Sequence, residues 1–234
     1  MLKSAGLLDK YFYLFMSLLI AAVVVYGFSQ TVDQHLFHAT PPRPLLLYVH
    51  AAVFSGWVAF FILQSTLVRT RNLHLHRLLG CFGVALGLAI PVLGSSTAIT
   101  MARFNMLHFH STDDASGLIF SFFDMTAFTI PFALAIAWRK KPEIHRRLFL
   151  IASCALTSAA FARFPWGLPL PGFFYAELDL LILLGVARDL ILSRHIHRVY
   201  LYALPAMILG QVVVVYTGLH DLPYWHKIGD AILR

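Results

Sequence analysis

Charged residues and cysteines are both scarce in this chain of 234 residues. Only 12% of the residues are charged, whereas soluble domains carry roughly 25%, and 59% belong to the set AVILMFWYC. A soluble fold of this length cannot hide so much apolar surface, and a disordered chain has the opposite composition. Two cysteines are too few for a disulfide scaffold. The class that remains is a polytopic membrane protein.

Long apolar runs support the same conclusion. A helix needs roughly 20 residues to cross a hydrocarbon core of about 30 Å. The runs are continuous rather than alternating, so we expect helices and not barrel strands. The sequence therefore predicts an all-α bundle of seven transmembrane helices in a single domain, residues 1–234, arranged as one lead helix and three hairpins. The expected spans are residues 11–29, 45–68, 78–101, 116–138, 147–164, 174–193 and 199–218.

The basic residues are distributed unequally between the two sides of the predicted membrane. Most of the 18 lysines and arginines lie on the side of the N-terminus. By the positive-inside rule, the N-terminus is cytoplasmic and the C-terminus is outside. The net charge of +7 then reflects topology and contact with the lipid bilayer and its anionic head groups, and we expect no nucleic-acid partner. The five on the other side are Arg43, Arg103, Arg163, Lys227 and Arg234.

A His-Arg pair recurs at the start of three helices that are expected to run outward. The three pairs are His76-Arg77, His145-Arg146 and His197-Arg198. Two interpretations stay open. The arginines are interfacial anchors beside incidental histidines, or the six side chains form a basic ring that binds a phosphate, a lipid head group or a haem propionate as cofactor-binding residues. We expect Asp189, near the inner end of the sixth span, to pair with an arginine of this ring.

Two stretches of the chain carry a family resemblance. Residues 48–80 include Trp57, Gln64 and the segment HRLLG, and residues 141–163 include KPEIHRRL and AAFAR. They resemble an uncharacterised family of bacterial polytopic membrane proteins, a domain of unknown function, over roughly residues 45–200. The resemblance implies this membrane fold and the bacterial inner membrane. It implies no function, because that family has no settled reaction.

The 12 histidines lie near the two ends of the expected spans and none is at mid-bilayer. A haem held between two histidines deep in the bundle is therefore not expected, and any haem would bind near one face. Outer histidines and aspartates together form a ligand set suited to zinc, iron or copper. The alternative is a group of solvated interfacial side chains. The expected metal ligands are His50, His108, His110, Asp113 and Asp114.

Charges inside apolar spans indicate function, because an unpaired charge there costs several kcal/mol. Asp124 lies about eight residues into the fourth span and has no local partner in the sequence. We expect Asp124 and His50 to be the catalytic residues. We also expect His50 to share one cavity between the second, third and fourth helices with His108 or His110 and with one of Asp113, Asp114 or Asp124. For Arg163, we expect an ion pair with an acidic residue early in the sixth span, Glu177 or Asp179.

The two cysteines, Cys81 and Cys154, both lie in apolar runs. We expect both thiols to be packed in the bundle and unreactive. Gly83 and Gly87 form a G-x-x-x-G pattern on the third helix, which predicts close packing against neighbouring helices.

Three functions stay open at this point. The first is a metal- or haem-linked membrane oxidoreductase or metal-dependent enzyme, with a transition metal or haem as cofactor at the outer face. The second is a non-enzymatic accessory or assembly subunit that packs against other membrane subunits. The third is a proton-coupled transporter that uses Asp124.

Overall fold

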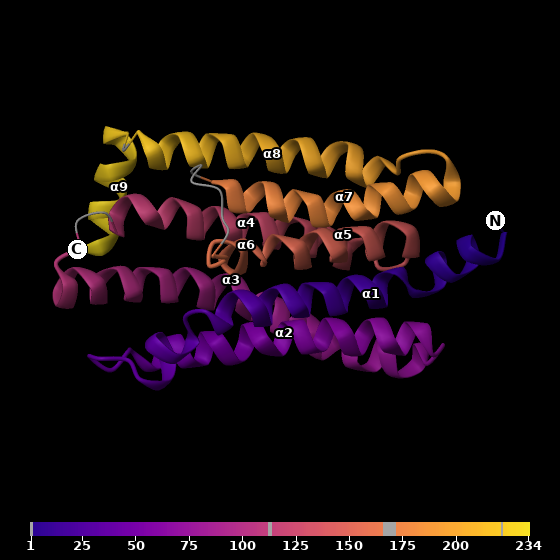
Figure 1. The fold of residues 1–234 in the computed structure, drawn as a ribbon, viewed down its shortest axis with the longest axis horizontal. Coiled ribbons are helices and arrows are strands. Elements are labelled where there is room, and N and C mark those ends of the chain that lie inside the picture. Colours follow the sequence, from indigo (N-terminus) through magenta and orange to yellow (C-terminus); the bar gives the residue numbers. More distant parts are fainter. Residues whose placement is uncertain (1, 112–113, 166–171, 221) are drawn as a thin grey trace.

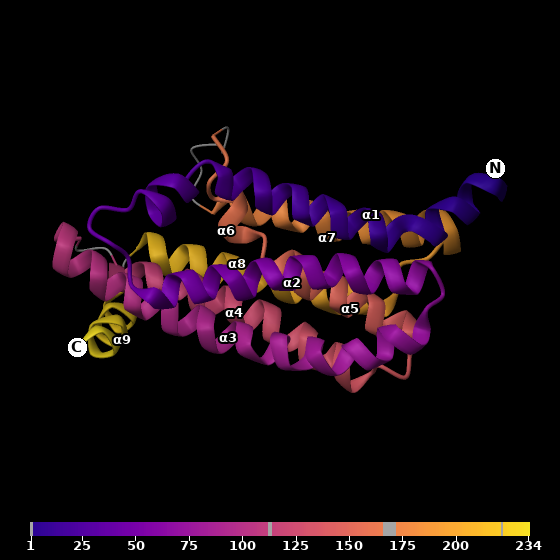
Figure 2. The ribbon, with the colours of Figure 1, turned by 90° about the horizontal axis from the view of Figure 1, so that it is seen from below.

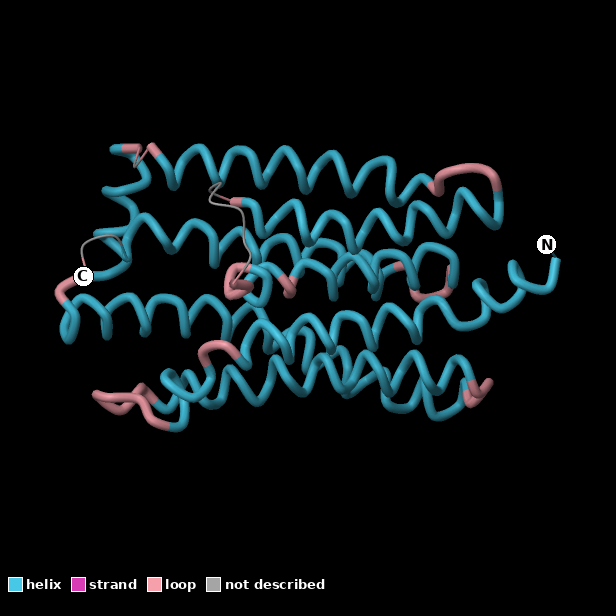
Figure 3. The backbone as a smooth tube through the Cα atoms, in the orientation of Figure 1, coloured by secondary structure: helices cyan, strands magenta, loops and turns pink. Residues whose placement is uncertain are grey.

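The computed structural model describes residues 2–111, 114–165, 172–220 and 222–234. In this part of the chain the regular structure is helical, with no strand (Figure 3). A π-helical turn, Asp33–Phe37, lies between the first two helices. The helices are α1 (Leu2–Ser29), α2 (Leu45–Arg69), α3 (Leu73–Phe109), α4 (Asp114–Ala137), α5 (Pro142–Ala155), α6 (Ser158–Phe161), α7 (Phe173–Ser193), α8 (Arg198–Leu219) and α9 (Pro223–Leu233).

The long helices run side by side along one axis, and α9 lies across one end of the bundle (Figures 1 and 2). The N-terminus lies at the opposite end, together with the connections α2–α3, α4–α5 and α7–α8 (Figure 1). We name these two ends the α9 end and the N-terminal end. Helix α4 packs against α3, α5, α8 and α9, so it occupies a central position.

Five helices in the described residues are long and apolar enough to cross a membrane. An integral membrane protein is therefore indicated, as the composition predicts. Large apolar side chains on the outer face of α3, such as Phe82 and Val92, are exposed, which suits contact with lipid. The five segments are Gly6–Ser29, Leu45–Arg69, Leu73–Phe109, Ala115–Ala137 and Arg198–Leu219.

The two other expected spans differ from the sequence prediction. The run 147–164 is not one helix, because α5 ends at Ala155 and α6 begins at Ser158. At the break the Thr157 hydroxyl donates to the backbone carbonyl of Cys154 at 2.6 Å, a bond that bends helices. The run 174–193 is a single helix, α7, but it contains four charged residues. Within the described residues, length and apolarity thus identify five candidate spans, and the count of seven stays a prediction.

Helices pack closely at the two glycines of α3 where the sequence predicts close packing. A Cβ atom built on Gly83 would lie 2.3 Å from the Phe60 ring of α2, and one on Gly87 would lie 2.2 Å from the Phe132 ring of α4. Both glycines are buried, and they let the aromatic rings of two neighbours approach the α3 backbone. The core beside them is centred on Trp57, whose ring meets Phe132 edge-on at 5.6 Å.

The prediction for the cysteines is half wrong. Cys154 is buried, but Cys81 is exposed on α3. An apolar run does not tell which face of a helix meets the bundle and which meets lipid, because both faces are apolar in a membrane. Cys81 lies one residue from the exposed Phe82, on the face that lipid would cover.

Candidate functional site

Asp124 lies at the contact of three helices. It is ten residues beyond the start of α4, roughly 15 Å along the helix axis. The Ser158 hydroxyl of α6 donates to its Oδ2 at 2.6 Å, and the Tyr175 hydroxyl of α7 donates to its Oδ1 at 3.1 Å. Ser158 and Tyr175 are both buried. The two hydroxyl groups therefore hold the carboxyl group through both of its oxygens.

Both hydroxyl donors lie in the first turn of a helix. Ser158 is the first residue of α6, directly after the break at Thr157. Tyr175 is in the first turn of α7, which follows Gly172 in the left-handed region at φ 77°. A side chain in that conformation would be strained. Two hydroxyl groups from the starts of separate helices therefore meet one carboxyl group on α4.

A second acidic residue lies one turn further along α7. Asp179 follows Tyr175 at i+4, so the two share a helix face. The Gln211 amide of α8 donates to Asp179 Oδ1 at 3.0 Å, and Gln211 is buried. We name Asp124, Ser158, Tyr175, Asp179 and Gln211 the acidic cluster.

The acidic cluster is suited to proton exchange. Among the described residues, no lysine, arginine or histidine hydrogen-bonds to Asp124 or Asp179. A carboxylate without a cation in an apolar bundle is costly, and its neutral form removes that cost. The hydroxyl groups of Ser158 and Tyr175 can each donate or accept a hydrogen bond. They therefore satisfy either protonation state of Asp124 without breaking an ion pair.

A different polar group occupies the N-terminal end of the bundle. Arg147 of α5 donates to both oxygens of Asp189 on α7, at 2.9 and 2.7 Å. Arg188 donates to Asp189 Oδ1 at 2.9 Å and also pairs with Asp9 of α1. Glu143 completes the group by accepting from Arg147 at 2.7 Å. With Arg146, which lies 2.5 Å from Glu143, we name these six residues the ion-pair network.

The ion-pair network balances three arginines with three carboxylates and joins α1, α5 and α7. The side chain of Asp189 is 1% exposed and that of Arg188 is 2% exposed. Buried charges of opposite sign with several hydrogen bonds hold helices in one register. The network therefore fixes the N-terminal end of the bundle, and the charges it contains are already paired.

No family model, no curated protein and no solved structure matches this chain. The site is therefore interpreted from its own geometry. The resemblance to an uncharacterised bacterial membrane family stays a prediction.

Two histidines of the predicted His-Arg ring form hydrogen bonds with nearby backbone groups. His145 Nδ1 bonds the backbone carbonyl of Ala135 at 2.8 Å, and His197 Nδ1 accepts from the Val199 amide as the N-cap of α8. His76 lies close enough to His145 for their charges to interact. Burial lowers the pKa of His197, and Arg147 acts in the same direction.

The arginines of the predicted ring differ from one another. Arg146 belongs to the ion-pair network, whereas Arg77 and Arg198 are exposed. Asp189 pairs with Arg147 and Arg188, neither of which belongs to the ring, so that pairing prediction is wrong. An anion or haem bound by all three His-Arg pairs stays a prediction.

The predicted metal ligands at the α9 end do not form a group in the described residues. The ring of His50 stacks on that of Phe54 at 3.9 Å, and its Nδ1 is buried without a hydrogen-bond partner among the described residues. His108 Nδ1 bonds the carbonyl of Phe104 at 3.0 Å. Nowhere in the described residues do three His, Cys, Asp or Glu side chains gather as a metal site would require.

The three other predicted metal ligands are His110, Asp113 and Asp114. His110 is the exposed C-cap of α3, at φ 52°. Asp113 lies outside the described residues, and the side chain of Asp114 does as well. Their part in a metal site stays a prediction.

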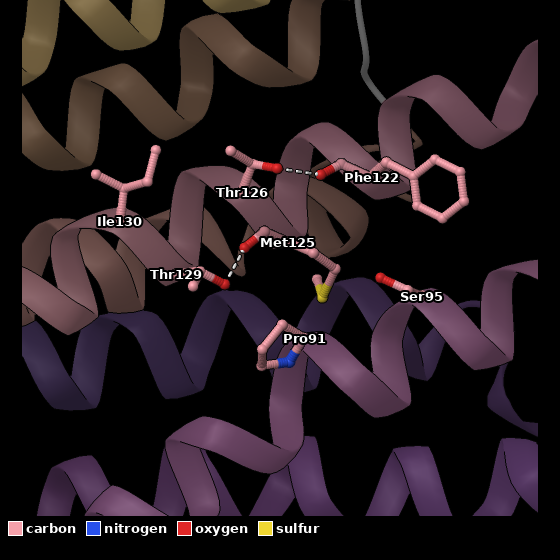
Figure 4. A pocket seen from close by; sticks show the side chains of 7 residues that line it. All are labelled: Pro91, Ser95, Phe122, Met125, Thr126, Thr129 and Ile130. Carbon is pink, nitrogen blue, oxygen red and sulfur yellow. Dashed lines mark hydrogen bonds between the residues drawn. The ribbon is translucent and has the colours of Figure 1, made fainter.

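The predicted cavity shared by His50 and Asp124 between the second, third and fourth helices stays a prediction. A groove lies between α3 and α4 beside Pro91, but none of the predicted site residues lines it (Figure 4). Its two threonines are bonded within α4, Thr126 to the Phe122 carbonyl at 2.8 Å and Thr129 to the Met125 carbonyl at 2.6 Å (Figure 4). Among the described residues, His50 and Asp124 share no hydrogen-bond or ring-stacking partner. The expected catalytic pair is not brought together by these contacts.

The pairing predicted for Arg163 is wrong. Its Nε donates to the Thr31 hydroxyl at 3.1 Å, and a further bond reaches the backbone carbonyl of Ala159. The guanidinium also lies 4.5 Å from the centre of the Phe28 ring. The ring and the two oxygen acceptors satisfy the cation in place of an acidic residue of α7.

Proposed function

We propose that the protein moves protons across a membrane through Asp124, as a proton-coupled transporter does. The observation that supports this is the carboxyl group of Asp124, held within a candidate membrane span by the neutral hydroxyls of Ser158 and Tyr175. Intramembrane carboxyl groups are costly and recur in proton relays. A carboxyl group that served only to join helices would be better stabilised by an arginine, as Asp189 is in the ion-pair network.

The interrupted helix beside Asp124 supports the same function. Helices broken at membrane depth are typical of transporters, and irregular backbone there requires protein or a cavity around it. The break between α5 and α6 is surrounded by protein, since Ala155, Thr157 and Ser158 are buried. A short α6 that moves relative to α5 would change the bond between Ser158 and Asp124, and with it the readiness of the carboxyl group to release a proton.

The topology that accompanies this function has seven crossings. In this proposal α5 with α6 forms the fifth crossing and α7 the sixth, because both run beside the five candidate spans (Figure 1). Two of the four charges of α7, those of Arg188 and Asp189, are paired in the ion-pair network, which lowers the cost of its crossing. The N-terminus is then cytoplasmic, the C-terminus is outside, and the protein lies in a bacterial inner membrane with anionic lipid head groups at its basic end.

Reconstitution into liposomes tests the function. The purified protein is placed in vesicles with a trapped pH-sensitive dye, a proton gradient is imposed, and potassium with valinomycin holds the membrane potential near zero. We expect protein-containing vesicles to equilibrate faster than empty vesicles. We expect Asp124→Asn, which keeps the shape of the side chain and one oxygen acceptor but cannot release a proton, to reduce the rate to that of empty vesicles.

A matched carboxyl group provides the control. Asp33→Asn makes the same change on the exposed π-helical turn, where Asp33 pairs with His38 at 2.7 Å, and it should leave the proton flux unchanged. Equal fluxes for wild type and Asp124→Asn, or no flux above empty vesicles, would refute the proposal.

The other two functions stay predictions. A metal- or haem-linked oxidoreductase gains no support from the contacts of His50 or His108 described above. Metal analysis and an absorption spectrum of the purified protein test it directly. An accessory role beside other membrane subunits would be tested by the size of the complex extracted in mild detergent.

A further inference from the structure

A groove between α7 and α8 runs past the acidic cluster. It has a volume of about 400 Å³, within the size range of small-molecule sites. Three residues of the acidic cluster, Tyr175, Asp179 and Gln211, line it. The remaining lining residues are Gly172, Ala176, Val212, Val215, Tyr216, Leu219 and His220.

The walls of the groove suit an apolar molecule that arrives from the lipid. Val212 is 60% exposed and Leu219 is 54% exposed, and both belong to the candidate span Arg198–Leu219. Exposed surface on such a helix faces lipid. A ligand dissolved in the bilayer therefore reaches the groove without crossing water.

The polar groups of the groove suit a cation. Asp179 accepts one hydrogen bond, from Gln211, and a carboxylate has room for about four. No lysine or arginine is among the described lining residues. His220 bonds the carbonyl of Tyr216 through Nδ1 at 2.9 Å, at the mouth of the groove. A single carboxylate is a poor site for a metal ion, but it is a sufficient partner for one ammonium group.

We propose that the α7–α8 groove binds a lipophilic amine, with its ammonium group on Asp179 and its apolar part against Val212, Val215 and Leu219. The inference rests on the proposed function, since it names the solute class that proton movement would drive. Tyr175 connects the two sites, because it lines the groove and its hydroxyl bonds Asp124. An amine in the groove therefore lies one residue away from the proton-exchanging carboxyl group.

Binding to the purified protein in detergent tests this inference. The probes are a dansyl-labelled long-chain primary amine and the alcohol of the same chain length, each followed by its fluorescence. We expect wild-type protein to bind the amine more tightly than the alcohol. We expect Asp179→Asn, which preserves an acceptor for Gln211, to weaken amine binding by about tenfold or more and to leave alcohol binding nearly unchanged, because about 1.4 kcal/mol of charge-assisted bonding corresponds to tenfold.

Two further variants control for the change of charge and for the place where the probes bind. Glu177→Gln makes the same change of charge on the same helix, but Glu177 does not line the groove, so amine affinity should be unchanged. Val212→Trp fills the groove from an exposed position and should weaken binding of both probes. Equal affinity of wild type and Asp179→Asn for the amine, or an equal loss in Glu177→Gln, would overturn the inference.

The same protein separates this inference from the proposed function. Asp124→Asn should retain amine binding while losing proton flux in liposomes. Flux that depends on Asp124 without Asp179-dependent amine binding would refute only the amine site. Amine binding with no flux above empty vesicles would refute only the proton-coupled function.

Discussion

Replacing Asp189 by asparagine removes the charge on which two buried arginines converge. Asp189 accepts two hydrogen bonds from Arg147 and one from Arg188. The variant keeps the size of the side chain but presents an amide donor to one of the guanidinium groups. We expect a large loss of stability, because both arginines lose the partner that offsets their desolvation.

The magnitude follows from burial. The side chain of Arg147 is 6% exposed, and breaking a buried pair by removing one charge costs about 3–5 kcal/mol. Arg147 retains Glu143 and Arg188 retains Asp9, so the lower part of that range is expected. Asp189→Asn should therefore lower the free energy of unfolding by about 3 kcal/mol.

Unfolding in mixed detergent micelles with increasing dodecyl sulfate, followed by circular dichroism, measures this change. Glu143→Gln provides the control, since Glu143 is in the same network but is 59% exposed and should cost at most about 1 kcal/mol. A cost below about 1 kcal/mol for Asp189→Asn, or equal costs for the two variants, would show that the network does not hold the N-terminal end together.

Three further outcomes test the packing. Gly87→Ala should lower stability by about 1–3 kcal/mol, because its new Cβ would lie 2.2 Å from the Phe132 ring, and Gly80→Ala should not, because nothing lies within 4 Å. A small apolar maleimide should label exposed Cys81 in membranes much faster than buried Cys154, and equal rates would contradict the assigned faces of α3 and α5. Gly229→Val should release α9 to protease, because a Cβ there meets the Ala115 carbonyl at 2.9 Å, and a similar effect of a substitution at exposed position 231 would contradict this docking.

The helices could be predicted because an apolar run long enough to cross a membrane has few other structures open to it. The runs beginning near residues 11, 45, 78, 116 and 199 all lie in long helices. The break at Thr157 could not be predicted, since Thr is common in apolar helices and only its bond to the Cys154 carbonyl shows that the helix stops there. A count of hydropathy also takes no account of charges that are paired in space, such as those of Arg188 and Asp189 on α7.

One residue of the candidate site, Asp124, could be predicted from the sequence. Asp124 stands out in the sequence because a carboxyl group is costly in an apolar run. Its partners Ser158 and Tyr175 come from helices whose neighbours the sequence does not reveal. The i, i+4 spacing of Tyr175 and Asp179 after Gly172 was the one local signal available.

The arginines of the ion-pair network were missed for a related reason. The positive-inside rule treats every arginine near a helix end as a surface anchor, but Arg147 and Arg188 face inward. The outer histidines are ambiguous in the sequence for another reason. Several of them bond a carbonyl one turn back on their own helix, as His108 and His220 do, and a sequence pattern cannot distinguish this from a shared metal site.

Infrared difference spectroscopy of the purified protein during a pH titration tests the central claim most directly, because a neutral carboxyl group has a C=O stretch that a carboxylate lacks. We expect a neutral-carboxyl band that appears and disappears reversibly with pH, retained in Asp33→Asn and absent in Asp124→Asn. A difference spectrum that is the same in wild type and Asp124→Asn would show that Asp124 does not exchange a proton, and the proposed function would fall with it.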